Sequence, residues 1–404
     1  MEKLDAVLQI LRAALWGQEA YPLMLEPNLD LNGVYKELVD QTVDGISVDV
    51  LGTRGFLEES VRKAYMMQVA KRISVWHRLM KEQEELRQLF GEANVPFAII
   101  KGAAADMYYP KPEYRAMGDI DVVVTPEAYM CAVQTLQDHG FALEDGDQRR
   151  HANLKRNGVE VELHHCFATM NDVAAAAKLD DLIFEGVKEP CEGRIGEFVF
   201  PMLPKLANGL VLLAHIDHHM EYGIGLRQII DWMLFVDCEL DDTWWQQEFG
   251  EWTRKLGLEK EAMVITRMCQ QYLGLREDGI SWCRKVDDEL CRKMLLWTLD
   301  RGNFGRKMTE DHDAVRVLNE IPKLKDIPKQ LQAYGRINWK LIQKYPFLKA
   351  FAWLYQLCRY VRLALSRKKP IRQFVEDVKV SRGESAFLDC LEVGRRRKDN
   401  NPVL

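Results

Sequence analysis

Two aspartates separated by one residue, Asp119 and Asp121, open the apolar run Asp-Ile-Asp-Val-Val-Val. Alternate residues of a β-strand project to the same side, so both carboxylates should lie on one face of a strand. Like charges at this spacing repel each other, and burial increases the cost. The pair therefore predicts a compensating cation, either a hard divalent ion such as Mg²⁺ or a basic side chain such as Arg115. A turn cap beside Gly118 is the remaining structural alternative.

A later segment could supply a third carboxylate. Residues 158–165, Gly-Val-Glu-Val-Glu-Leu-His-His, alternate apolar and polar side chains, so one face of this strand is apolar and the other carries Glu160 and Glu162. One of these acids, added to Asp119 and Asp121, would complete a ligand set for two metal ions about 3.5 to 4 Å apart. Such a pair of ions is the clamp used for in-line phosphoryl or nucleotidyl displacement.

Residues that precede both of these strands offer a complementary phosphate site. Lys101-Gly102 follows the β-rich run Val-Pro-Phe-Ala-Ile-Ile and precedes an alanine-rich stretch, which predicts a strand, a turn and the start of a helix. Backbone N–H groups at such a turn can hold phosphate oxygens. Lys101 and Arg115 could reach the same phosphates. The alternatives are a surface position for Lys101 and a structural ion pair for Arg115.

The elements that must position these residues divide the chain into three ranges. Apolar positions recur at helical spacing over residues 1–90, and short β-rich runs alternate with helical patterns over 91–200. The second range includes a hairpin signal at Asn157-Gly158 and a loop rich in Gly and Pro at 187–204. Helical patterns return over 201–404. We expect an α+β protein with a small mixed sheet, N-terminal helices and a larger C-terminal helical region.

The order of strand, glycine turn, helix, Asp-x-Asp strand and later acidic strand resembles the polymerase-beta-like nucleotidyltransferase superfamily. More closely, the chain is similar to an uncharacterised bacterial nucleotidyltransferase family, whose pattern reads Lys-Gly, a small-residue helix, Tyr-Pro, Arg and Asp-Ile-Asp. In that family an acid on a later strand is followed by an apolar residue and a His, as in Glu162-Leu163-His164. The specific similarity covers residues 95–167, and weaker similarity extends over 212–234.

The resemblance implies a role for each candidate residue. Asp119 and Asp121 would be the first two ligands of two Mg²⁺ ions, and Glu162 the third, with Glu160 as the alternative. All three acids would be catalytic. The nucleotide-binding residues would be Lys101, Gly102, Ala103 and Arg115. The superfamily favours Gly-Gly or Gly-Ser at the turn, so Gly102-Ala103 keeps the backbone donors but lacks a hydroxyl.

The function that the resemblance implies is magnesium-dependent transfer of a nucleoside monophosphate from an NTP, such as ATP, to an acceptor hydroxyl, with release of pyrophosphate. The acceptor could be a small molecule such as a sugar, a protein side chain or a nucleic-acid end. Two other classes stay open: a catalytically degenerate protein that binds nucleotide or metal, and a helical interaction protein with the sheet as scaffold.

Composition excludes several classes of protein. The net charge of −6 provides no overall attraction for nucleic acid. Nine cysteines without a Cys-x-x-Cys pair support neither a disulfide framework nor a zinc ribbon. No apolar run is long enough for a membrane span, and the N-terminal stretch has charges where a signal peptide is apolar, which predicts a cytoplasmic protein.

Two further patterns allow more than one interpretation. His215 and His219, in His-Ile-Asp-His-His, are spaced to share a helix face, but no HExxH glutamate accompanies them, which favours packing over metal binding. Arg227 and Asp231 have the spacing of a helical ion pair, and a site-lining role is the alternative. Basic residues outnumber acidic ones over 367–404, which predicts a solvated tail, with a contact to phosphate or an anionic surface as the alternative.

Overall fold

The structure is a computed structural model, which describes residues 2–17, 29–52, 57–144, 150–168, 173–220 and 223–303, with Lys307 and short stretches within 331–366 and 387–391. The chain forms two compact units, Met1–Lys307 with Glu392–Leu404, and Met308–Leu391. In the second unit, the described helices are η8 (Pro346–Phe351) and α17 (Ala352–Ser366). The basic tail predicted at 367–404 lies outside the described residues, apart from a few positions around residue 388.

The N-terminal range is helical, as predicted. Its described elements are α1 (Glu2–Trp16), α3 (Leu31–Asp40), a π-helical turn η1 (Val48–Gly52) and the long helix α4 (Glu59–Glu92). The last of these carries a buried stripe that includes Trp76, Leu79 and Phe90.

A mixed sheet of seven strands follows, with the order β3-β4-β5-β2-β1-β7-β6. Its strands are β1 (Phe97–Ile99), β2 (Ile120–Val124), β3 (Ala142–Leu143), β4 (His151–Arg156), β5 (Val159–His164), β6 (Cys191–Ile195) and β7 (Phe198–Met202). The central strand β2 is antiparallel to β1 and parallel to β5. The predicted α+β class with a mixed sheet is confirmed.

The turn between β4 and β5 has the conformation that its sequence demands. Asn157 and Gly158 have φ angles of 51° and 76°, and both central residues of a type I′ turn need positive φ. The turn sets the register, in which Arg156 pairs with Val159 and His151 with His164. The alternation of β5 follows, because Val159, Val161 and Leu163 are buried in the core.

The interpretation of residues 187–204 as a loop is wrong, because this range contains the hairpin β6–β7. Strand β7 pairs in parallel with β1 through Ile99 and Met202. Phe198, Phe200 and Met202 alternate toward the core, whereas Gly193, Gly196 and Pro201 mask this pattern in the sequence. Gly193 is required here, since a Cβ at this position would lie 2.4 Å from the ring of Phe200.

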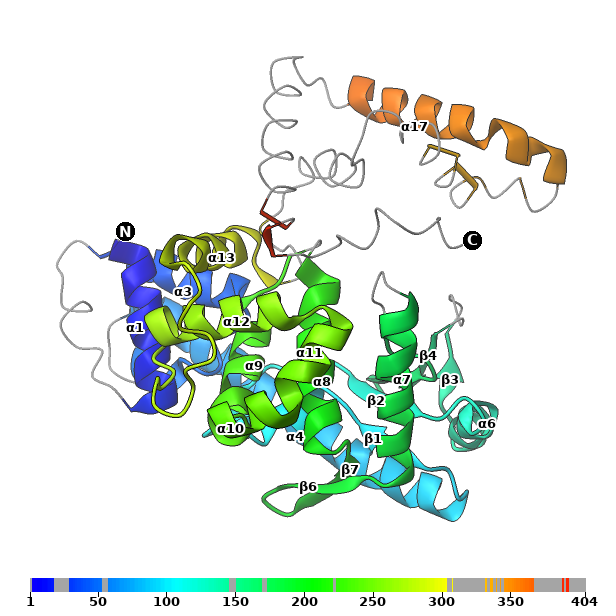
Figure 1. Ribbon diagram of the computed structural model, residues 1–404, viewed down its shortest axis with the longest axis horizontal. Coiled ribbons are helices and arrows are strands. Elements are labelled where there is room, and N and C mark those ends of the chain that lie inside the picture. The colour runs from blue at the N-terminus through cyan, green and yellow to red at the C-terminus, as the bar shows by residue number, and fades with distance from the viewer. Residues whose placement is uncertain are drawn as a thin grey trace. The chain divides into compact units, whose positions relative to one another are not determined.

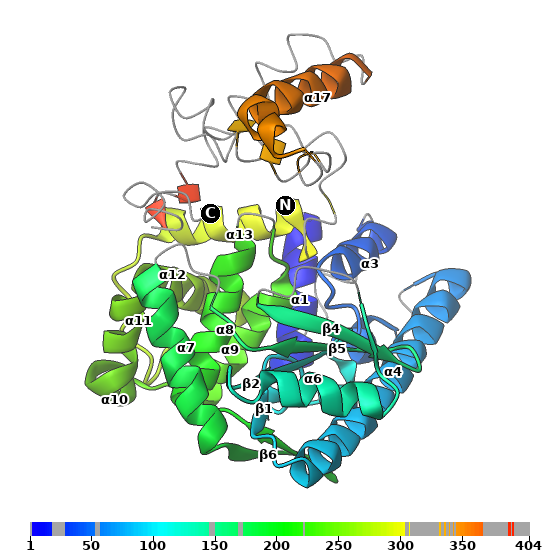
Figure 2. The same ribbon diagram turned by 90° about the vertical axis from the view of Figure 1, so that its right-hand side faces the viewer.

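Helices cover both faces of the sheet (Figure 1). Ile120, Val122 and Val124 share a core with residues of α4 and of α6 (Tyr129–Asp138). Helix α7 (Val173–Lys188) contacts β1 and β2, and Figure 2 shows it alongside the strands. Residues of β2 on the side opposite Ile120 and Val122, Asp121 among them, therefore do not face the α4–α6 core.

The C-terminal range of the first unit is helical, as predicted. Its elements are α8 (Lys205–Met220), α9 (Leu226–Glu239), α10 (Asp242–Trp244), η3 (Trp245–Phe249), α11 (Gly250–Leu256), α12 (Glu259–Met268), η4 (Cys269–Leu273) and α13 (Asp288–Arg301). Helices α8 and α9 pack against each other. Trp16 donates a hydrogen bond to the Leu273 carbonyl, which joins the first helix to this range. Among the described residues, no helix combines the length and apolar character of a membrane span.

Candidate active site

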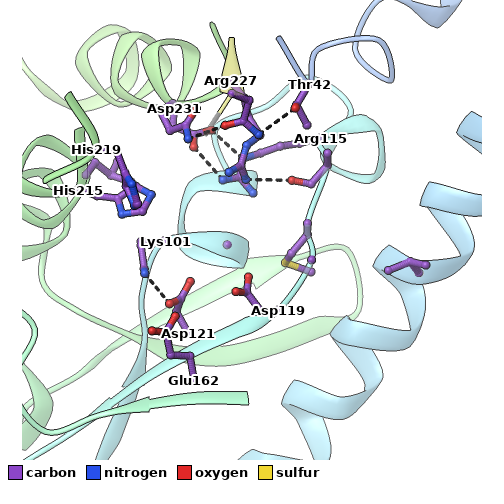
Figure 3. Close-up of a pocket in the computed structure, with 18 of the residues that line it drawn as sticks. Thr42, Lys101, Arg115, Asp119, Asp121, Glu162, His215, His219, Arg227 and Asp231 are labelled. Carbon is purple, nitrogen blue, oxygen red and sulfur yellow. Dashed lines mark hydrogen bonds and ion pairs between the residues drawn. The ribbon is translucent and has the colours of Figure 1, made fainter. Parts of the chain in front are cut away.

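Three carboxylates converge on one face of the neighbouring strands β2 and β5. Asp119 immediately precedes β2, and the parallel register places Asp121 opposite Glu162. One oxygen from each of the three side chains lies within 4.8 Å of the other two (Figure 3). The register of two neighbouring parallel strands therefore assembles the acidic group.

Glu160 has a different environment from Glu162. It pairs across the hairpin with Lys155, at 3.1 Å between Nζ and Oε2, and Lys155 also contacts Glu144 at 2.9 Å. Of the two acids on this strand, the structure brings Glu162 to the aspartates and engages Glu160 with a lysine.

Lys101 lies inside the acidic group. Its Nζ is 2.5 Å from Asp121 Oδ1, and its side chain is only 12% exposed, so the surface alternative is wrong. Burial lowers the pKa of Lys101, but the charges of Asp121 and Glu162 outweigh this effect and raise the pKa above its usual value. The backbone of Lys101 has φ 54° and ψ −125°, a combination that disfavours a residue with a Cβ. This strained turn between β1 and α5 (Gly102–Asp106) directs the ammonium group into the cleft.

The three acids share too little positive charge to be fully ionised. Burial and the neighbouring Asp121 raise the pKa of Glu162 to about 8. The same two causes raise the pKa of Asp119 above its usual value. Burial opposes ionisation of Asp121 too, but Lys101 and His164 hold its pKa well below the usual range. Without a further cation, Glu162 therefore holds a proton in preference to Asp121.

The turn after β1 has little room for side chains. A Cβ on Gly102 would lie 3.2 Å from Met117 Sδ, and Ala103 is fully buried. Gly102 lines the cavity, whereas the Ala103 side chain packs into the core. Any contact of Gly102 or Ala103 with a ligand must therefore come mainly from the backbone.

Arg115 forms a buried ion cluster. Its Nε and Nη2 donate to the two oxygens of Asp231 at 2.7 and 2.8 Å, and Nη1 donates to Asp106 at 2.8 Å. Trp76 donates to Asp106 and Tyr109 to Asp231. The structural ion-pair alternative for Arg115 is thus present, with partners on α5 and α9 in place of Asp119 and Asp121.

The predicted helical pair between Arg227 and Asp231 is replaced by the contact between Asp231 and Arg115. Arg227 instead donates from Nη1 to the Ala116 carbonyl at 3.1 Å, three residues before Asp119. Its Nε is buried and has no hydrogen-bond partner within the part of the chain that the structure describes. Arg227 lines the cavity, so the site-lining alternative describes its position.

An open cavity of about 1160 Å³ contains the acidic group, Lys101, Gly102 and Arg227. Sequence reasoning missed several of its residues, because they come from separate elements and carry no local motif: Lys71, Arg72, Arg150 and His151.

His215 and His219 also line this cavity, with ring centroids 4.5 Å apart. Burial and nearby positive charge lower the pKa of His219 to about 3 and that of His215 well below its usual value. Among described residues, neither belongs to a group of three potential metal ligands.

The comparison with known families decides the relationship of the chain. A family model described as an uncharacterised nucleotidyltransferase matches residues 48–274, which is more than half of the chain. The chain belongs to this nucleotidyltransferase family. The match contains every residue of the acidic group and the cavity-lining parts of α8 and α9.

Other comparisons add little to this assignment. The chain is similar to the crystal structure of an antigenic nucleotidyltransferase-like protein from Paracoccidioides brasiliensis, at 15% sequence identity and a TM-score of 0.33. The alignment covers 49% of this chain and 93% of the chain in that structure. No curated protein matches the chain. The nucleotidyltransferase family is therefore assigned from the family model, which agrees with the motifs between residues 97 and 165.

Proposed function

We propose that this nucleotidyltransferase moves a nucleoside monophosphate from an NTP to an acceptor hydroxyl and depends on a divalent metal. The proposal also places the chain in the polymerase-beta-like superfamily. The observation that carries it is the convergence of Asp119, Asp121 and Glu162 beside the Gly102 turn in one open cavity.

The acidic group fits two Mg²⁺ ions, since it offers oxygen donors and excess negative charge. Asp119, Asp121 and Glu162 would hold the ions, which neutralise phosphate charge and lower the pKa of the acceptor hydroxyl. A carboxylate oxygen of Glu162 takes the hydroxyl proton as the acceptor oxygen bonds to the α-phosphorus. The bond from the α-phosphorus to the bridging oxygen breaks, and pyrophosphate leaves with that oxygen.

The cations around the acids have separate tasks in this proposal. Lys101 neutralises Asp121 in the free protein, and the NTP phosphates offer it a second anionic partner. Backbone N–H groups of Gly102 and Ala103 face the same phosphates. Arg227, with a buried Nε that lacks a partner in the described residues, takes the phosphate-binding role that the family resemblance implies for Arg115. Arg115 holds the loop before Asp119 in place through Asp106 and Asp231.

A scaffold would leave the shifted pKa values of the acids without a use, and the retention of all three acids argues against a degenerate protein that binds nucleotide without turnover. Perturbed carboxyl groups inside a cavity are a feature of functional sites. The acidic group therefore favours the catalytic alternative over both others.

The melting temperature tests ligand binding at this site. In wild type, Mg²⁺ with an NTP should raise it, because a ligand that binds only the native state stabilises that state by about 2.7 kcal/mol at a concentration of 100 Kd. Asp119→Asn should melt at the same or a slightly higher temperature in EDTA, because the raised pKa shows that the negative charge of Asp119 opposes folding at neutral pH. The same variant should lose the shift caused by Mg²⁺ and NTP.

The exposed Asp181→Asn on α7 is the matched control and should behave as wild type. A large loss of metal-free stability in Asp119→Asn would identify Asp119 as a structural residue. Absence of any shift with all four NTPs in wild type would exclude both an enzyme and a nucleotide binder.

A further inference from the structure

A second cluster of potential ligands shares Glu162 with the acidic group. Donor atoms of His151, Glu162 and His164 all lie within 4.8 Å of one another. The cluster follows from the hairpin, because His151 on β4 pairs with His164 on β5 and Glu162 lies two residues before His164 on the same face. The two imidazole centroids are 5.4 Å apart.

The spacing of these donors suits one metal ion. His151 Nε2 is 3.2 Å from Glu162 Oε1, and His164 Nε2 is 3.7 Å from Glu162 Oε2. Ligands held about 2.0 to 2.2 Å from one ion lie roughly 3 to 3.6 Å apart, so small side-chain adjustments would suffice. Asp121 Oδ1, 3.1 Å from His164 Nε2, is a possible fourth donor.

The cluster is both accessible and preorganised. All three residues line the open cavity, which leaves room for water or substrate in the remaining coordination positions. His164 is buried beneath the cleft between Glu162 and Asp121, and the ring of Phe167 lies edge-on at 5.7 Å. These contacts fix the imidazole with Nε2 toward the carboxylates.

The donor types separate this cluster from the acidic group. Mg²⁺ prefers oxygen ligands, whereas imidazole suits first-row transition metals. We propose that His151, His164 and Glu162 bind a divalent transition-metal ion of the Mn²⁺, Co²⁺ or Zn²⁺ class. The site lies beside the proposed magnesium position and requires neither nucleotide nor turnover. Its ligand set is joined to the proposed function through Glu162 and, as fourth donor, through Asp121.

Co²⁺ is the probe for this site, because its visible absorption reports on the ligands that surround it. Titration of the full chain, free of nucleotide and with Mg²⁺ in excess to occupy the acidic group, should produce one saturable set of ligand-field bands. His151→Gln should weaken Co²⁺ binding by at least about 100-fold, since loss of even an outer partner of a metal ligand costs about 10- to 100-fold. His164→Gln should have a similar effect. Mg²⁺ binding should stay unchanged in His151→Gln.

Two controls separate the new site from its neighbours. His165→Gln should keep the bands, because His165 follows the strand and packs against Tyr129 at 4.1 Å between centroids. Asp119→Asn should keep them too, since Asp119 is outside this ligand set. His151 is partly exposed, whereas His164 is buried. His151→Gln is therefore expected to fold and provides a test even if His164→Gln does not.

Wild-type Co²⁺ affinity in His151→Gln, or absence of a saturable band in wild type, would overturn the inference. Both results are expected if His151, His164 and Glu162 only form hydrogen bonds with each other and bind no metal. The outcome is independent of the nucleotide test, because a magnesium- and NTP-dependent rise in melting temperature can occur with or without Co²⁺ binding.

Discussion

Glu162→Gln should lower NTP turnover by at least about 10²- to 10³-fold, the usual cost of losing one preorganised electrostatic partner at a reacting centre. Glu162 lies with Asp119 and Asp121, so its carboxylate is placed both to hold a metal ion and to take the proton of the acceptor hydroxyl. Replacement removes both a ligand and a proton acceptor. Pyrophosphate release at saturating Mg²⁺ measures the effect.

Glu160→Gln is the matched control two residues away on the same strand. Its carboxylate is 35% exposed and pairs with Lys155, so its loss should change turnover less than about threefold, in line with the small energies of surface ion pairs. An inactive Glu160→Gln with an active Glu162→Gln would reverse the assignment. Wild-type turnover in both variants would remove the mechanism.

Arg115→Met should lower the free energy of unfolding by about 3 to 5 kcal/mol, which is typical of breaking a buried ion pair. Arg115 is 2% exposed, and its removal leaves Asp106 and Asp231 buried without their guanidinium partner. Urea unfolding at neutral pH measures the loss. Arg62→Met, which breaks an exposed pair with Glu59 on α4, should cost less than about 1 kcal/mol.

The difference in the free energy of unfolding between wild type and Arg115→Met should become smaller as the pH falls. Burial already raises the pKa of Asp106 to about 6 against the opposing charge of Arg115. Without Arg115 that pKa rises further, so the folded variant takes up protons that wild type does not bind, and acid stabilises it relative to wild type. A stable but inactive Arg115→Met would contradict the structural role and restore the predicted contact with the nucleotide.

Local sequence rules predicted much of the sheet. The turn at Asn157-Gly158 requires positive φ, and the alternation of Val159, Val161 and Leu163 identifies the buried face of β5. The hairpin β6–β7 escaped these rules, since Gly193, Gly196 and Pro201 interrupt its alternating pattern and its pairing with β1 spans about a hundred residues. Distant pairing of this kind leaves no periodic signal in a short window.

Local sequence patterns also predicted only part of the candidate site. Strand parity predicts that Asp119 and Asp121 share a face, but the choice of Glu162 over Glu160 depends on the register between β2 and β5 and on Lys155. Arg115 meets Asp231 across 116 positions of sequence, so no local pattern could name that partner. Lys101 reaches Asp121 only because its backbone adopts a strained turn.

The fate of a labelled phosphate tests the central claim most directly. Wild type with Mg²⁺, a cell extract as acceptor and an NTP labelled at the α-phosphate should transfer the label to an acceptor, whereas label at the γ-phosphate should leave as pyrophosphate. Asp119→Asn should do neither. Transfer of the γ-label to the acceptor, or equal transfer by Asp119→Asn, would contradict nucleotidyl transfer at this acidic group.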